Sequence, residues 1–310
     1  MGKSIRAAYG EALVRCGTEN GNIVVLDADV SSSTQSCLFA KAYPQRFFNM
    51  GIAEANMTAV AAGLAAAGKI PFVNTFAVFL TSIGLAPARL FGSYSQLPIK
   101  LAGAYGGLSD AFDGPSHHAL EDIAVMRTLP GFEVYVPCDA VQTEWVTRHA
   151  AASPKATYLR LSRDVFPEVY QEGESFESGK GRVVREGTDA TVVACGLMVG
   201  NALKAAELLA QEGIYLRVVD MFCIKPIDRD LILRCAKETR AIVSAEEHSV
   251  AGGLGGAVAE VLAQEGAGVP MGFVGMQDCH AESAPYAELQ KKYRLDAPAI
   301  AQAVREALSR

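Results

Sequence analysis

The chain has 310 residues, of which 50% are hydrophobic and 20% charged, a composition typical of a folded protein with a sizeable core. Domains usually run about 100–200 residues, so this length predicts two of them. The formal net charge of −6 argues against a nucleic-acid partner, and no apolar run is long enough to predict a membrane span.

The first half of the chain predicts alternating helices and strands. Near the N-terminus, helical spacing joins Ile5, Ala8, Tyr9, Ala12 and Leu13 on one face. Apolar runs bounded by turn residues then predict strands at 22–29, 69–76, 98–105, 132–139 and 156–162. Helices are expected at 53–67 and 140–153, the second of them capped by Asp139.

The pattern breaks at 167–187, which is polar, rich in Glu and Gly, and predicted to be a linker. Beyond it we expect strands at 189–196, 215–221 and 241–248, and helices at 201–213 and after Asp296. Such alternation favours mainly parallel sheets with helices on both faces. The predicted fold class is therefore α/β, with two open, mainly parallel-sheet domains at 1–166 and 188–310.

The cysteines predict a cellular location. Seven of them are scattered along the chain without a C-x-x-C pair or a Cys/His cluster, which predicts reduced thiols and no structural zinc. The N-terminal segment MGKSIRAAYGEALVRCGTEN lacks the apolar core of a secretory signal. We therefore expect a cytoplasmic protein.

One stretch, FFNMGIAEANMTAVAAGLAAAGKIPFVNTFAVF at 47–79, carries most of the functional information. Glu54 begins the predicted helix, where a carboxylate can simply stabilise the helix dipole. Its small apolar neighbours predict burial, and a buried acid needs a specific partner. Phe76 and Phe79 follow at helical spacing and are either ordinary core or one wall of a site. In the second case a flat heteroaromatic ring would stack on that wall, with a ring nitrogen held by Glu54.

This stretch resembles the pyrimidine-binding domain of transketolases, which use thiamine diphosphate. The resemblance continues through FDGPSHHALEDIAVMRTLPGFEVYVPCDAVQTE (112–144) and YLRLSR (158–163). It extends into the second half with CGLMVGNALKAAELLAQEGIYLRVVDMFCIKPID (195–228) and EEHSVAGGLGGAVAEVL (246–262). It implies a pyrimidine-binding domain at 1–166 and a transketolase C-terminal domain at 188–310.

A missing motif implies a partner. In transketolases a GDG motif in a separate domain holds the diphosphate and its magnesium, and GDG does not occur in this sequence. The resemblance therefore implies the small subunit of a split transketolase, active only with a large subunit that carries the diphosphate domain and Mg²⁺. This chain itself would supply no metal ligand. An α2β2 assembly is expected by analogy.

The resemblance also implies the roles of the cofactor residues. Glu54 matches the catalytic glutamate that holds a proton on N1′ of the aminopyrimidine. Phe76 and Phe79 match ring-stacking positions, with Phe79 favoured for direct contact, while Ser82 stands where many members have a third aromatic residue. Asp29 matches an acid near the thiazolium ring, although an acid in this position is also a common helix cap or turn former.

The substrate residues are implied in the same way. In DGPSHH, Asp113 matches a residue that contacts hydroxyls of the sugar donor, and His117 matches a catalytic histidine that contacts substrate oxygens. His118 is expected to play a supporting role. Arg163 matches an arginine for substrate phosphate, whose geometry suits a guanidinium group. Ser33 is a further candidate for the phosphate.

One departure from the family concerns the donor pocket. Sugar transketolases usually have another histidine before this motif, and 102–112 contains none, so Tyr105 or a main-chain group would have to replace it. The expected reaction is transfer of a two-carbon ketol unit from a ketose, ketose phosphate or sulfosugar to an aldose or aldose phosphate. The alternatives are the β subunit of a 2-oxo acid dehydrogenase decarboxylase, which has the same layout, or a non-catalytic subunit.

Overall fold

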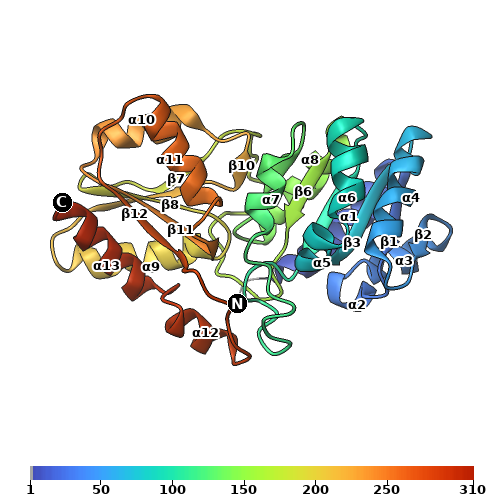
Figure 1. The fold of residues 1–310 in the computed structure, drawn as a ribbon, viewed down its shortest axis with the longest axis horizontal. Helices are drawn as coiled ribbons and strands as arrows, with labels where there is room; N and C mark the ends of the chain where they lie inside the picture. Colours follow the sequence, from blue (N-terminus) through green and yellow to red (C-terminus); the bar gives the residue numbers. More distant parts are fainter. Residues whose placement is uncertain (1–2) are drawn as a thin grey trace.

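The computed structural model describes residues 3–310 and contains two α/β units that lie side by side (Figure 1). The elements of the first unit are α1 (Ile5–Glu19), β1 (Ile23–Asp27), α2 (Ser31–Thr34), α3 (Cys37–Ala42), η1 (Pro44–Arg46), β2 (Phe47–Asn49), α4 (Glu54–Ala66), β3 (Ile70–Phe76), α5 (Ala77–Ser82), α6 (Leu85–Pro87), η2 (Ala88–Tyr94), β4 (Lys100–Ala104), α7 (Asp122–Thr128), β5 (Glu133–Tyr135), α8 (Ala140–Ala152) and β6 (Thr157–Arg160). The later elements are β7 (Arg182–Arg185), β8 (Ala190–Ala194), α9 (Met198–Ala210), β9 (Leu216–Asp220), β10 (Cys223–Lys225), α10 (Arg229–Glu238), β11 (Ile242–Ser249), α11 (Leu254–Gln264), β12 (Met271–Met276), α12 (Tyr286–Lys292) and α13 (Ala297–Leu308).

Each unit is built on one mainly parallel sheet. The first sheet has seven strands in the order β10-β5-β6-β4-β3-β1-β2, and only β10 runs antiparallel, against β5. The second has five strands in the order β12-β11-β8-β9-β7, with β7 antiparallel to β9. The α/β fold class with two such sheets is confirmed. The central strands are buried along their whole length, as their near-continuous apolar runs predict.

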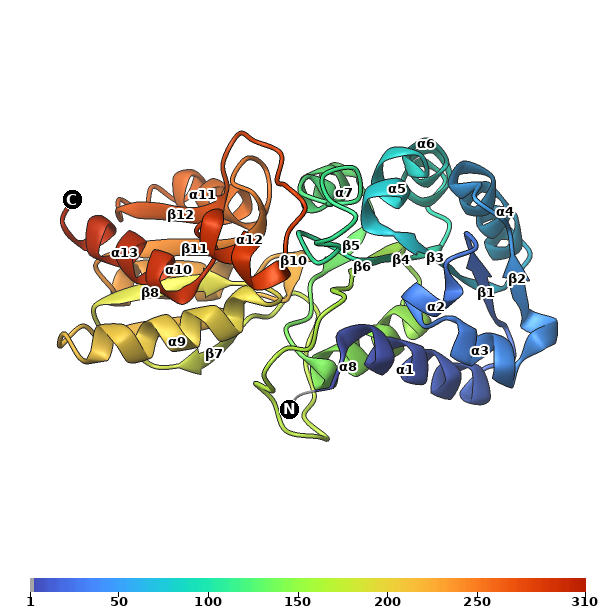
Figure 2. The same ribbon diagram turned by 90° about the horizontal axis from the view of Figure 1, so that it is seen from below.

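Helices cover both faces of each sheet, as Figure 2 shows. In the first unit, α1 and α8 bury Tyr9, Leu13 and Val146 against one face, whereas α4, α5 and α7 bury Met57 and Leu80 against the other. In the second unit, α9 and α13 lie on one face, and α10 and α11 on the opposite face. Within residues 3–310 no helix is both long and apolar enough to cross a bilayer.

Two short strands depart from the sequence-based expectation. The segment 167–187 was predicted to be irregular, yet β7 lies inside it and pairs with the edge of the second sheet. β10 comes after the second sheet has begun, yet it returns to pair with β5 in the first sheet. Both are three or four residues long and depend on pairing with distant partners, which a local pattern does not reveal.

The carboxyl ends of β1, β3, β4 and β6 meet at one edge of the first sheet, because these neighbouring strands are parallel. Loops that follow parallel strands at this edge are the usual position of a ligand site in open α/β sheets. Phe76 is the last residue of β3, and Asp29, Tyr105 and Arg163 come shortly after β1, β4 and β6. The fold therefore brings residues from distant parts of the sequence to a common edge.

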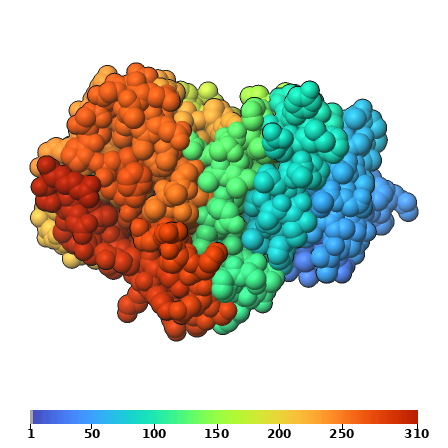
Figure 3. Space-filling view, viewed as in Figure 1, coloured from blue at the N-terminus to red at the C-terminus, as the bar shows by residue number. Residues whose placement is uncertain are grey.

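A buried arginine, Arg160, joins the two units. Arg160, the last residue of β6, donates from Nε to Asp122 Oδ2 at 2.7 Å, and both side chains are buried. Its Nη2 donates to the backbone oxygens of Ala119, at 2.9 Å, and of Glu247 in the second unit, at 2.8 Å. Burial by itself lowers the pKa of the Arg160 guanidinium group, but the charge and hydrogen bond of Asp122, together with the nearby Glu247, raise this pKa above its usual range. In the space-filling view the two units pack directly against each other on the visible face (Figure 3).

Replacing Arg160 tests this junction. Arg160→Gln leaves the Asp122 carboxylate buried without its counter-charge, so we expect the free energy of unfolding to fall by about 3–5 kcal/mol. Urea unfolding followed by circular dichroism measures the change. The exposed pair Arg148–Glu19 provides the control, and Arg148→Gln should cost no more than about 1 kcal/mol. A loss below about 1 kcal/mol for Arg160→Gln would show that the junction does not depend on this pair.

Candidate functional site

Glu54 is the first residue of α4 and is 3% exposed. Its Oε1 accepts a hydrogen bond from Thr75 Oγ1 at 3.3 Å, and its backbone oxygen accepts one from Thr58 Oγ1 at 2.9 Å. Among residues 3–310, no side chain or backbone group donates to Oε2. A buried acid at a helix N-terminus thus keeps one oxygen without a donor, which a buried carboxyl normally has.

The two predicted phenylalanines belong to an aromatic cluster. Phe76, at the end of β3, stacks on Tyr105 with ring centroids 4.6 Å apart. Phe79 lies in the first turn of α5, with its ring centroid 6.0 Å from that of Phe76. It meets the His117 ring edge-on, at a centroid distance of 5.2 Å. Successive strand residues point to opposite faces, so Thr75 faces Glu54 while Phe76 turns towards Tyr105. Phe79 is half-buried and therefore offers ring surface to a ligand.

Two arginines flank Tyr105. The guanidinium carbon of Arg6, from α1, lies 5.5 Å from the Tyr105 ring centroid, and that of Arg163 lies 5.3 Å from it. Arg6 also donates to the Tyr105 hydroxyl at 2.8 Å and to the backbone oxygen of Ser33 at 3.1 Å. Both distances to the ring are within the range of a cation–π interaction. Arg163 and Ser33, predicted from the sequence, are thereby linked to Arg6, which was not.

The loop after Tyr105 brings three further titratable groups together. Side-chain ligand atoms of Asp110, Asp113 and His117 all lie within 4.8 Å of one another. Burial, reinforced by the nearby Asp113, raises the pKa of Asp110 to about 6. Asp110 Oδ1 already accepts a hydrogen bond from Nη1 of Arg163 at 3.2 Å, so this oxygen is engaged by a guanidinium group.

His118 and Asp29 lie at the margins of this arrangement. His118 is buried, and burial lowers the pKa of its imidazole, which favours the neutral ring expected of a supporting residue. Asp29 is exposed at the carboxyl end of β1, has a φ of +66°, and accepts a hydrogen bond from Asn49 at 2.8 Å. The buried acid nearby is Asp27, the last residue of β1, which accepts hydrogen bonds from Thr34 and Ser36.

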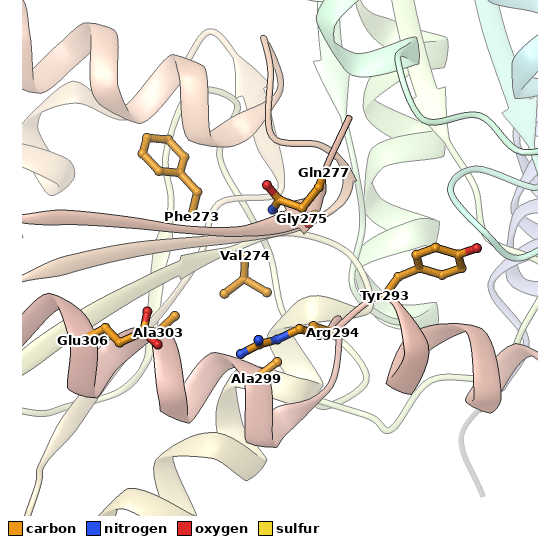
Figure 4. A pocket seen from close by; sticks show the side chains of 9 residues that line it. All are labelled: Phe273, Val274, Gly275, Gln277, Tyr293, Arg294, Ala299, Ala303 and Glu306. Carbon is orange, nitrogen blue, oxygen red and sulfur yellow. Dashed lines mark hydrogen bonds between the residues drawn. The ribbon is translucent and has the colours of Figure 1, made fainter. Parts of the chain in front are cut away.

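A separate hollow of about 260 Å³ lies in the second unit (Figure 4). Its lining comes from β12, from α13 and from the turn between α12 and α13, and includes Phe273, Gln277 and Arg294. None of the predicted site residues lines it. We find no chemical reason to connect it with the site at the edge of the first sheet.

Direct contacts thus join most of the predicted residues. Phe76, Phe79 and His117 touch one another, and Tyr105 connects them to Arg163. Two residues of the site, Arg6 and Asp110, were absent from the sequence-based prediction. Arg6 is an ordinary cation in an amphipathic helix, and Asp110 differs from other loop acids only through its burial, so neither carries a local signal.

Comparisons with known proteins place this geometry in a family. The model of the transketolase pyrimidine binding domain matches residues 2–168, and that of the transketolase C-terminal domain matches residues 179–300. A putative transketolase C-terminal section from Methanocaldococcus jannaschii is 40% identical over 310 residues, covering 99% of this chain and 97% of that protein. The 6-deoxy-6-sulfo-D-fructose transketolase subunit SqwH of Clostridium sp. (strain MSTE9) is 38% identical, covering 99% and 95%.

Two further comparisons define which part of the family this chain matches. Human transketolase is 39% identical over 304 residues, which are 97% of this chain but 48% of that protein. A solved structure described as a split gene transketolase, inactive beta4 tetramer, has a TM-score of 0.91 and 48% identity, covering 100% of this chain and 99% of that one. The chain therefore belongs to the transketolase family and corresponds to its pyrimidine-binding and C-terminal domains.

Proposed function

We propose that this chain is the small subunit of a split, thiamine-diphosphate-dependent transketolase. In this proposal it transfers a two-carbon ketol unit from a ketose or ketose phosphate to an aldose or aldose phosphate. The observation that carries the proposal is Glu54, a buried acid with one uncommitted oxygen, at the same sheet edge as a partly open aromatic cluster. Family membership supplies the context, because transketolases in general depend on thiamine diphosphate.

The residues present fit the aminopyrimidine half of that cofactor. Oε2 of Glu54 is available to hold a proton at N1′, and the half-buried ring of Phe79 offers a stacking surface. Phe76 supports this surface from behind, since its own face is covered by Tyr105. Ser82 leaves one side of the pocket without an aromatic wall. When bound, thiamine diphosphate supplies the reactive carbon that accepts the two-carbon unit.

The substrate contacts proposed for this chain lie beside that surface. His117, which packs against Phe79, and the exposed Asp113 would orient sugar hydroxyls by hydrogen bonds. Arg163 and Ser33 would face the anionic end of a substrate. Asp29 would lie near the thiazolium ring. These groups bind and orient the reactants, which lowers the entropic part of the barrier.

A partner subunit would complete the site. Large apolar side chains are exposed next to three site residues: Ile52 is 83% exposed, Ile83 52% and Phe112 69%. They are close in sequence to Glu54, Phe79 and Asp113, and such exposure around a site favours a protein partner. The relative solved as a beta4 tetramer is described as inactive, and this chain spans about half of human transketolase. We therefore propose an α2β2 enzyme in a reducing cytoplasm, with Mg²⁺ held by the large subunit.

The first test is ketol transfer by the reconstituted enzyme. This chain and a large subunit carrying the diphosphate domain would be assayed together and separately, with thiamine diphosphate, Mg²⁺, a panel of ketose donors and ribose 5-phosphate as acceptor. We expect transfer only with both chains. Glu54→Gln should lower kcat by about 100-fold or more because it removes the proton-holding group. Glu144→Gln, an exposed acid on α8, is the matched control and should change kcat by less than about twofold.

Other outcomes would contradict this proposal in distinct ways. Decarboxylation of 2-oxo acids without transfer to an aldose would assign the chain to the dehydrogenase branch. Full activity of Glu54→Gln would remove the proposed role of the carboxyl. Absence of any turnover with a folded partner would favour the non-catalytic alternative.

Phe79→Ala tests the stacking surface. Loss of the ring should weaken the thiamine diphosphate affinity of the assembled enzyme by at least about fivefold, since an aromatic contact contributes about 1 kcal/mol beyond its buried area. Cofactor titration of the apoenzyme, followed by quenching of intrinsic fluorescence, gives the dissociation constant. Phe273→Ala is the control, because Phe273 is an exposed phenylalanine of the second unit. Equal cofactor affinity of Phe79→Ala and the unmodified enzyme would exclude Phe79 as a stacking residue.

A further inference from the structure

Arg163, predicted to bind substrate phosphate, is already engaged. Its Nη1 lies 3.2 Å from Asp110 Oδ1. Its backbone N–H donates to Oγ of Ser109, the residue before Asp110. The Asp110 side chain has no exposed surface, whereas that of Arg163 is 39% exposed. The second oxygen of Asp110, Oδ2, is buried and has no hydrogen-bond partner among the described residues. A buried carboxylate with one unsatisfied oxygen therefore faces the arginine.

Arg6 lies near the same tyrosine ring, but its partners are different. It donates to Tyr105 and to the Ser33 backbone, and within residues 3–310 it forms no salt bridge with a carboxylate. Of the two guanidinium groups beside Tyr105, Arg163 is thus paired with a carboxylate at hydrogen-bond distance, whereas the hydrogen-bond partners of Arg6 are neutral. An anion that enters the site can bind Arg6 without displacing a carboxylate, but it can bind Arg163 only in competition with Asp110.

The charges around the Arg163–Asp110 ion pair make it unfavourable for a dianion to displace Asp110 from Arg163. Asp113 lies next to Asp110. Asp164 is also close to both arginines: burial raises the pKa of its carboxyl, and the positive charges of Arg163 and Arg6 oppose that rise. Two guanidinium groups and the imidazole of His117 therefore lie among three carboxylates. With a pKa of about 6, Asp110 is mostly ionised at neutral pH, and a second negative charge beside it is repelled.

We propose that Asp110 is a specificity-determining residue that neutralises Arg163 and selects against substrates ending in a dianionic phosphate, relative to singly charged or uncharged ends. A sulfonate, which carries one negative charge, meets half the repulsion of a phosphate dianion. An uncharged sugar terminus meets none. The inference rests on the proposed function, because it presumes that Arg163 and Arg6 face the terminus of a sugar substrate.

Anion binding to the isolated chain tests this inference without catalysis. Isothermal titration calorimetry at about pH 8 and fixed ionic strength would measure inorganic phosphate, mainly a dianion, and methanesulfonate, a monoanion. We expect Asp110→Asn to tighten phosphate binding by about tenfold and methanesulfonate binding by about threefold, because the Coulomb energy scales with ligand charge. The Asp110→Asn/Arg163→Gln double variant should bind phosphate no more tightly than the unmodified chain does.

A matched control separates the ion pair from general electrostatics. Asp164→Asn removes a nearby negative charge that is not paired with Arg163, and it should change phosphate affinity by less than about threefold. Circular dichroism confirms that each variant is folded. Unchanged or weaker phosphate binding by Asp110→Asn would overturn the inference, as would a gain that persists without Arg163 or an equal gain for both anions. Because no turnover is measured, this result stands apart from the outcome of the transfer assay.

Discussion

The arrangement of the site depends on the buried guanidinium group of Arg160. It sits at the end of β6, is paired with Asp122 and binds the backbone of both units, through Ala119 and Glu247. The same side chain packs under Gly106, where an added Cβ would lie 2.7 Å from Arg160 Cγ. At the next residue, Gly107, the φ of +67° and the nearby Glu247 carboxylate leave no room for a side chain. The loop that begins at Tyr105 is therefore shaped by the second unit, although all its proposed functional groups belong to the first.

This connection gives the second unit a physical role in the site. Without Glu247 and Arg160, the loop carrying Asp110, Asp113 and His117 would lose the side chains that pack against Gly106 and Gly107 at its start. Parallel strands then account for the remaining geometry, because they deliver Phe76, Tyr105 and Arg163 to one edge of the sheet. Glu54, the first residue of α4, contacts the same edge of the sheet by accepting a hydrogen bond from Thr75 near the end of β3. Ile52, Ile83 and Phe112 are exposed close in sequence to these groups, which supports the proposal that a partner subunit packs here.

Much of this fold could be predicted from local patterns. The buried parallel strands read as apolar runs, and the Asp139 cap was predicted and is observed as a hydrogen bond from the Gln142 N–H at 2.8 Å. Glu54, Phe76 and Phe79 were predicted as site residues from an acid among small apolar residues, two aromatics at helical spacing and the resemblance to transketolases, and these roles stay predictions. β7 and β10 were missed because short strands depend on distant pairing. Arg6 and Asp110 were missed because they join the site through Tyr105 and Arg163, which are distant in the sequence, and no spacing in the sequence reports such contacts.

The central claim is that this chain provides the pyrimidine half of a thiamine diphosphate site and that a second subunit provides the rest. The most direct measurement is the affinity for thiamine diphosphate, with Mg²⁺ present, of this chain alone, of the large subunit alone and of the two mixed. We expect weak or absent binding by either chain, with a dissociation constant above about 1 mM, and binding in the micromolar range by the mixture. The mixture should bind one cofactor for each copy of this chain. Tight binding by the isolated chain, or none by the assembled pair, would contradict the account.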